Sequence, residues 1–223
     1  MKIPLIINPV FVLSLFFLTG CASTANRVMH GYGRMNVSGS VLGVVLIRKN
    51  IQMLNAEDVA RDLGRGACED AYYVFFGAEF PARLKARSGF ANVYFVQDGD
   101  EMLGNSGTAA DGMRAALPSR KGCISDSLQY LLIVDYLTVG HERKSNMTVG
   151  GGSDGDFGGF FSGSESLTHS ADFVLWDNKE GTIAAYGSIR ERIKLYDTMT
   201  KAVWIDMLEK MARSVTKGMP YRK

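Results

Sequence analysis

The stretch Tyr130–Val139 constrains the fold of this chain more than any other part of the sequence. Its first half, Tyr-Leu-Leu-Ile-Val, is apolar at every position, and its second half tends toward alternation. A continuous apolar run of this length is typical of a central strand that is covered on both faces. We therefore expect a sheet with this strand near its middle and other layers packed against it.

Further strands and one tight turn are indicated around this centre. Apolar or alternating runs predict strands over residues 41–47, 92–97, 170–176 and 182–194. The polar segment 177–181, Asp-Asn-Lys-Glu-Gly, is typical of the turn of a β-hairpin between the last two. The last strand alternates, which predicts one face in the core and one in water.

Two helices are expected, one after the first strand and one at the C-terminal end. Asn55 is a plausible N-cap, and Pro81 should break or kink the helix. Thr198 can cap the final helix, with Gly218 and Pro220 just beyond its end. The apolar stripes that predict the two helices are Val59, Leu63, Ala67, Ala71, Val74, Phe75 and Ala78, and then Val203, Trp204, Met207, Leu208, Met211 and Val215. A shorter helical piece is expected at 109–117.

Together these elements predict an α/β (α+β) fold. We expect a mixed β-sheet of about five strands, with a long N-terminal helix and a C-terminal helix packed on it, and a β-hairpin near the C-terminal end. One domain should cover residues 41–223, interrupted by a glycine-rich loop at 150–163. Because each glycine loses much backbone entropy on ordering, that loop is expected to be mobile.

The first 21 residues predict where the protein works. Residues 1–20 carry Lys2 and then an apolar run too short to span a bilayer comfortably, as in a signal peptide rather than an uncleaved anchor. Leu18-Thr19-Gly20-Cys21 resembles the processing site of bacterial lipoproteins, which implies that Cys21 becomes the acylated N-terminus. Ala22 stands where an inner-membrane retention signal often has Asp, which favours the outer membrane, with the domain facing the periplasm.

The segment 21–40 is expected to be a tether between this anchor and the domain, and His30 within it a solvated residue. Without Lys2 the chain has 24 Lys and Arg against 23 Asp and Glu, so nothing indicates a nucleic-acid partner. Cys68 and Cys123 remain as candidates for one disulfide in an oxidising compartment, and two buried free thiols are the alternative.

No arrangement of residues predicts catalysis, a metal site or a cofactor. Gly104-Asn-Ser-Gly-Thr108 looks superficially like a nucleophile loop, but no pattern places His141 or His169 as its base. The three histidines show no ligand spacing. Gly151–Asp156 is a single imperfect copy of a calcium-binding repeat, and a glycine-rich turn is the simpler interpretation.

Two surface features are candidates for binding a partner. Tyr186, Arg190 and Arg192 share the predicted exposed face of the last strand, and residues of these types are favoured at protein interfaces. Phe157, Phe160 and Phe161 lie in the glycine-rich loop, where exposed aromatic residues favour docking to a protein or a membrane. The alternatives are a solvated sheet face and aromatic residues that cover the domain's own core.

The order of these elements, from residue 41 to about 217, resembles the α/β domain shared by the TolB amino-terminal domain, LpoB and CsgG. The resemblance is carried by the lipoprotein site, the β-α-β opening, the Tyr-Leu-Leu-Ile-Val strand and the Trp176–Gly181 hairpin turn. It implies non-catalytic work at the bacterial envelope through binding of other proteins. A homo-oligomer is a separate option. No pair of long amphipathic hairpins is evident, which argues against a pore.

The sequence therefore predicts a lipid-anchored envelope protein that assembles or regulates a complex for secretion, transport or cell-wall synthesis. An envelope hydrolase and a ring-forming secretion-pore component are the alternatives.

Overall fold

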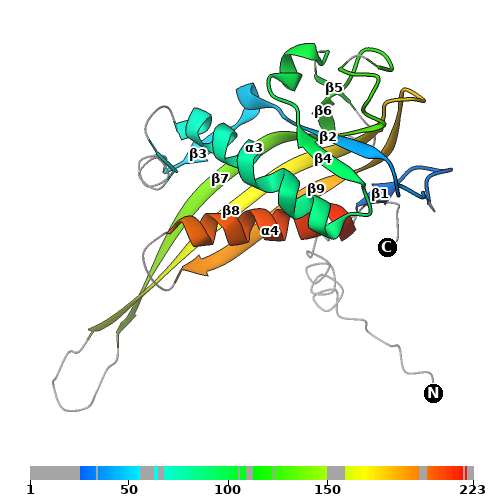
Figure 1. The fold of residues 1–223 in the computed structure, drawn as a ribbon. Coiled ribbons are helices and arrows are strands. Elements are labelled where there is room, and N and C mark those ends of the chain that lie inside the picture. The colour runs from blue at the N-terminus through cyan, green and yellow to red at the C-terminus, as the bar shows by residue number, and fades with distance from the viewer. Residues whose placement is uncertain are drawn as a thin grey trace, which may run out of the picture.

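A computed structural model gives the architecture. It describes residues 26–33, 35–55, 63–64, 68–104, 106–108, 113–122, 124–149, 159–195, 200–217 and 219. Within them, a seven-stranded mixed sheet carries two helices on one face (Figure 1). The prediction of a mixed α/β fold is confirmed.

The sheet has the strand order β1-β9-β8-β7-β2-β4, and β3 pairs with β7 beyond the end of β2. The pairs that β2 makes with β4 and β7, and that β3 makes with β7, are parallel, whereas β7, β8, β9 and β1 are antiparallel. The strands are β1 Arg27–Val28, β2 Val41–Leu46, β3 Gln52–Leu54, β4 Asn92–Phe95, β7 Tyr130–Val149, β8 Gly159–Asp177 and β9 Thr182–Leu195. The expected number, about five, was too low because β1 and β3 are too short to show a period.

The predicted central strand, β7, lies between two apolar cores. Leu132 and Val134 of β7 face the helices, and Leu131 and Ile133 face a second apolar cluster on the opposite side. All four are fully buried. Coverage on both faces explains why this run carries no polar residue.

Two helices, α3 (Cys68–Arg87) and α4 (Lys201–Lys217), lie side by side on the same face of the sheet (Figure 1). Glu79 pairs with Lys201 at 3.8 Å, and Arg87 pairs with Glu209 eight residues further along each helix. The two ion pairs therefore link parallel helices in register.

The predicted first helix does not run unbroken from Asn55 into α3. Gly64 has φ of 124° and is not helical. Residues 56–62, which Asn55 was expected to cap, lie outside the described part. The helix α3 instead begins at Cys68, with Glu69 and Asp70 in its first turn, where acidic residues complement the helix dipole.

Pro81 does not break α3, contrary to expectation. It lies inside the helix and is buried, between the buried side chains of Phe80 and Leu84. The residue four positions earlier, Gly77, has no side chain and approaches the ring of Phe95 so closely that a Cβ would lie 2.6 Å from it. Burial of this helix face offsets the hydrogen bond that proline cannot make.

The predicted apolar stripe of α3 was also displaced around the helix. Val74 is 69% exposed, whereas Tyr72, Phe76 and Phe80 are fully buried. The larger aromatic side chains bury more apolar area than alanine and valine, and they determine which face packs on the sheet.

In α4 the prediction is confirmed, since Trp204, Met207, Leu208, Met211 and Val215 are all buried. The expected caps Thr198, Gly218 and Pro220 lie outside the described residues.

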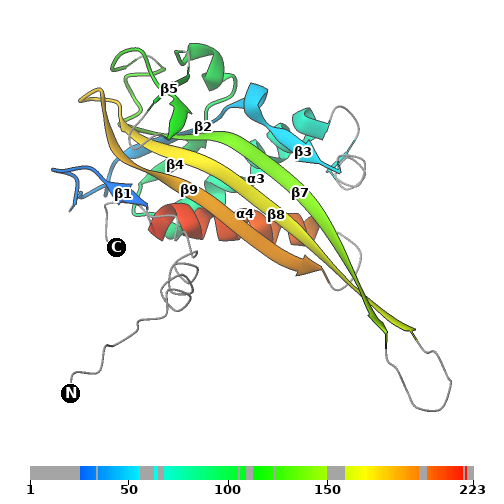
Figure 2. The ribbon, with the colours of Figure 1, turned by 180° about the vertical axis from the view of Figure 1, so that it is seen from behind.

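The opposite face of the sheet is only half covered. A two-stranded ribbon of β5 (Ser106–Thr108) and β6 (Arg114–Ala116), with the 3-10 turns η1 (Arg48–Asn50) and η2 (Gly99–Met102), belongs to the end of the sheet where β2 and β4 lie. The remaining length of β7, β8 and β9 is uncovered there (Figure 2). A helical piece at 109–117 had been expected, but Arg114–Ala116 is a strand and buries Ala115 and Ala116.

The stretch that was expected to be a tether packs on the domain from Asn26 onward. Arg27 and Val28 pair with Tyr186 and Ala185 of β9, and the Asn26 side chain donates to the carbonyl of Ser214 in α4 at 3.2 Å. Val37 is buried in the main core. Residues 1–25 lie outside the described part. Across the described ranges, neither α3 nor α4 has the length and apolar character that a membrane-crossing helix needs.

Candidate functional site

The most distinctive feature of the molecule is a long two-stranded ribbon formed by β7 and β8. Their pairing continues in register to Val149 opposite Gly159. On one side β9 ends at Leu195, opposite Glu165, and on the other β3 ends at Leu54, opposite Gly140. The ribbon thus extends beyond the rest of the sheet and beyond the helices, by roughly 15–20 Å for its last six residue pairs (Figures 1 and 2).

Ion pairs hold the base of this ribbon on both faces. On the helix side, Glu165 contacts His141 at 3.2 Å and Arg143 at 2.9 Å. On the uncovered side, Arg192 of β9 contacts Glu142 of β7 at 3.1 Å. These contacts connect β7, β8 and β9 at the point where β9 ends.

The ribbon corrects the expectation of a glycine-rich loop at 150–163. Residues 159–163 belong to β8, and Phe160 and Phe161 pair with Thr148 and Met147. Residues 150–158, including Phe157, lie outside the described part. The ribbon has a weak sequence signal because its strands contain few β-branched residues over 145–149 and 159–164. One signal was present, since both strands lack charge and proline over 145–149 and 159–164.

A buried carboxyl group lies at the bend of β7, just before the ribbon. Asp135 is fully buried and accepts hydrogen bonds from the Asn50 side chain at 2.7 Å, from the backbone N–H of Ala116 at 2.8 Å and from that of Tyr136 at 2.8 Å. Tyr136 has φ of 50°, and the register with β8 shifts between Asp135 and Thr138. A bulge of this kind bends a strand. Asp135 therefore links the bend to η1 through Asn50 and to β6 through Ala116.

The uncovered face of the sheet is polar where it approaches the ribbon. A shallow hollow of about 160 Å³ is lined by Tyr136, Ser170, Asp172, Ser188 and Arg190, among others. The Ser188 hydroxyl donates to Asp172 at 2.7 Å, and Arg190 is exposed. Hydroxyl and guanidinium groups on an open surface can bind anionic or hydroxyl-bearing groups of a partner.

The structure places the three predicted β9 residues differently. Arg190 is exposed as expected. Arg192 is exposed too, but its guanidinium donates to the Ser166 hydroxyl at 2.8 and 3.0 Å and pairs with Glu142. It therefore fastens the ribbon base.

Tyr186 is not on an exposed surface. It is only 6% exposed and packs in a small cluster with Ala115 and Val174. The prediction of exposure failed because β6 and its neighbours, some 70 residues earlier in the chain, cover this end of the strand.

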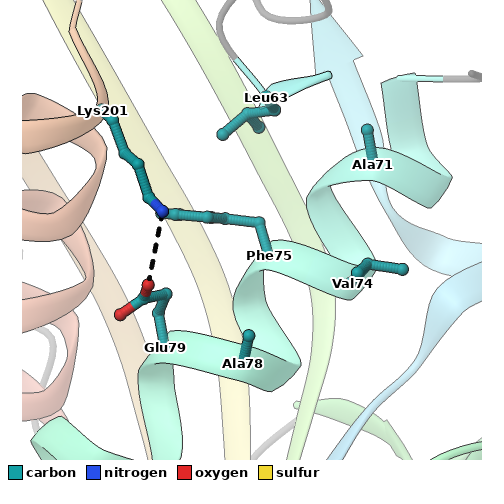
Figure 3. Close-up of a pocket in the computed structure, with 7 residues that line it drawn as sticks. All are labelled: Leu63, Ala71, Val74, Phe75, Ala78, Glu79 and Lys201. Atoms are coloured by element: carbon teal, nitrogen blue, oxygen red, sulfur yellow. Dashed lines mark ion pairs between the residues drawn. The ribbon is translucent and has the colours of Figure 1, made fainter. Parts of the chain in front are cut away.

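A second hollow, of about 230 Å³, lies between the start of α4 and one side of α3 (Figure 3). Leu63, Ala71, Phe75 and Ala78 give it an apolar lining, and the Glu79–Lys201 pair stands at its rim. The pocket therefore combines an apolar wall with one ion pair at its rim.

His169 and Tyr72 have strongly perturbed pKa values, and both lie deep in the core. The ring of His169 lies 5.5 Å from that of Tyr72 and 5.9 Å from that of Trp204, centroid to centroid. Burial lowers the pKa of His169 from 6.5 to about 3 and raises the pKa of Tyr72. Neither ring nitrogen of His169 has a hydrogen-bond partner among the residues that the structure describes.

The remaining candidates are spread over the molecule. Cys68 is half-buried at the start of α3, while Cys21 and Cys123 lie outside the described residues, so lipidation and the disulfide stay predictions. His30 is exposed near β1, far along the chain from His141 and His169. Within the described ranges, no three His, Cys, Asp or Glu side chains are grouped so that they could hold a metal ion.

The sequence matches no protein-family model and no curated protein. Several solved structures align distantly with this chain, among them the following three. A neuraminyllactose-binding hemagglutinin homolog from Helicobacter pylori aligns with a TM-score of 0.41 at 13% identity, over 83% of this chain and 86% of that one. The PelC dodecamer from Paraburkholderia phytofirmans aligns with a TM-score of 0.38 at 13% identity, over 88% of this chain and 98% of that one.

The third is a minor lipoprotein from Acinetobacter baumannii, with a TM-score of 0.33 at 11% identity, over 83% of this chain and 93% of that one. These likenesses are distant, and the resemblance to TolB, LpoB and CsgG stays a prediction. The function of this chain is inferred below from its own residues.

Proposed function

We propose that this protein is an outer-membrane lipoprotein, anchored through Cys21, whose periplasmic domain binds another envelope protein through the β7–β8 ribbon. The single observation that carries the binding proposal is the uncovered ribbon beyond Glu165. An isolated two-stranded ribbon is at best marginally stable in water. Pairing with a further strand would satisfy its open backbone groups.

The composition of the ribbon supports strand addition. Exposed edge strands usually carry lysine, proline or inward-pointing charge, which prevent pairing with other chains. Residues 145–149 and 159–164 have none of these. Both outer edges are open among the described residues, so an extended segment of a partner can add to either edge.

The positions of the titratable groups support a binding protein rather than an enzyme. A catalytic acid or base has to reach its substrate. The groups with the most perturbed pKa, His169 and Tyr72, are buried between the sheet and the helices, and they line none of the described hollows.

The anchor and the ribbon are tested separately. Labelled fatty acid should be incorporated into the wild-type chain and not into Cys21→Ala, and equal labelling of both would contradict the anchor. For the ribbon, cross-linking and pull-down from intact cells should recover a defined partner with the wild type. The variant Thr148→Lys with Ser162→Lys, which adds charge to both strands, should lose it.

A matched control is Lys49→Gln with Arg120→Gln, a pair of exposed residues away from the ribbon. The proposal is contradicted if the control and the ribbon variant recover the partner equally.

Self-association is the second candidate, because each copy has two different open edges. The edge of β7 on one copy can pair with the edge of β8 on the next, and such a head-to-tail contact generates a ring if it closes. In this case the cross-linked species would be multiples of the chain mass, and light scattering of the purified protein would show the same assembly.

A further inference from the structure

We infer that the exposed face of β9 beyond Tyr186, together with the adjoining edge at β1, lies against anionic phospholipid headgroups of the membrane that holds the anchor. The inference rests on the proposed function in one respect, the lipidation of Cys21. It concerns a different surface from the ribbon.

Four basic residues share this face and the edge of the sheet. Arg27 lies directly opposite Tyr186 in the β1–β9 pair. Side chains alternate along a strand, so Arg190, Arg192 and Lys194 lie on the same face as Tyr186 and therefore as Arg27. All four are exposed, and along β9 they cover roughly 25 Å.

The acidic residues on this face are engaged within the protein, and one of them, Asp135, is fully buried. Glu142 pairs with Arg192, and Asp172 accepts from Ser188. Arg190 and Lys194 make no ion pair among the described residues and present their charge to solvent. Cationic residues close to an anionic membrane surface each contribute favourably to binding.

The chain itself brings this face close to the membrane. Six residue steps separate Cys21 from Arg27, which allow at most about 20 Å of extended chain. Met29 follows just after β1 and is 37% exposed, whereas Val28, opposite Ala185, lies on the other face of the sheet. An exposed apolar residue beside basic residues is suited to the interface between headgroups and acyl chains.

This orientation also leaves the ribbon free for its partner. The base of the ribbon begins where β9 ends, at Leu195, so its last six pairs extend past the basic residues (Figure 2). The proposed membrane contact and the proposed protein contact therefore occupy different parts of the molecule.

The experiment is hydrogen–deuterium exchange of the full acylated chain in vesicles of phosphatidylcholine alone or with phosphatidylglycerol. Exchange over residues 188–195 should slow by about fivefold or more with phosphatidylglycerol at about 0.05 M salt, and the effect should disappear at about 0.5 M. Arg190→Gln with Lys194→Gln should remove it. The control Lys121→Gln with Lys179→Gln, exposed at the other end of the sheet, should retain it.

Equal exchange in the two lipids overturns the inference, and so does equal loss of protection in the two double variants. Mass spectrometry of the N-terminal peptide separates this failure from failure of the anchor. A chain without lipid on Cys21 contradicts the proposed function, whereas an acylated chain with unchanged exchange contradicts only the orientation.

Discussion

Acidification should destabilise this protein through one buried side chain, His169. The pKa of His169 is lowered to about 3 in the folded protein by burial alone, against 6.5 in the unfolded chain. Because the folded pKa is depressed, the unfolded state binds more protons between these two values. The free energy of unfolding therefore falls as the pH drops below about 6.5.

The size of the effect follows from the two pKa values. Between pH 7 and pH 5 the contribution of His169 falls by about 2 kcal/mol, because over that range the unfolded chain takes up a proton at this residue and the folded protein does not. Desolvation by burial is the cause of the shift, and the rings of Tyr72 and Trp204 are among the groups that pack around His169.

The assay is urea unfolding of the wild type and of His169→Leu at pH 7 and pH 5, followed by tryptophan fluorescence. The drop in unfolding free energy should be about 2 kcal/mol smaller in the variant, whatever its stability at pH 7. A control substitution at the exposed His30, His30→Gln, should leave the wild-type drop intact. Equal drops in His169→Leu and wild type would refute the reasoning.

Two further pairs of substitutions test the bend of β7 at Asp135 and the assignment of the buried face of α3. Asp135→Ala should lower the free energy of unfolding by about 2–4 kcal/mol, because three donors lose their acceptor, whereas the exposed Asp126→Ala should change it by less than about 0.5 kcal/mol. Phe76→Ala should cost about 3–5 kcal/mol and Val74→Ala under about 0.5 kcal/mol, since only Phe76 is buried. Both are measured by urea unfolding at pH 7, and similar costs for either matched pair would be the contrary result.

Patterns that depend on local sequence were predicted well. The turn 177–181 is one example. The Asp177 side chain accepts from the N–H groups of Lys179 and Glu180, both at 3.0 Å, and Gly181 adopts φ of 70°. The stripe of α4 is another, because its apolar residues recur at helical spacing and Trp204 identifies the buried side.

Patterns that depend on distant segments were not predicted. Tyr186 alternates correctly with its neighbours, yet β6 covers it. Proline is disfavoured inside a helix, but the packing of α3 on the sheet outweighs this local cost at Pro81. Asp135 appeared as one polar residue within a strand, and its three partners come from its neighbour Tyr136 and from segments 19 and 85 residues away.

The candidate site shows the same division. Arg190 was identified from alternation, because exposure on that stretch of β9 depends only on the strand itself. The ribbon could not be identified from local sequence. Its pairing is set by the register that begins in the core, at the pair Tyr130 and Asp177, and continues outward. Glycine and serine in β8 weaken the strand signal without preventing the pairing.

The measurement that tests the account most directly is site-specific photo-cross-linking from the ribbon in intact cells. A photoreactive phenylalanine derivative replaces Thr148 near the end of β7. The control replaces Tyr94, which is 54% exposed on the edge strand β4. The account predicts a discrete cross-linked species from position 148 and none from position 94. No discrete species from position 148, or the same species from both positions, would contradict a ribbon that binds a partner.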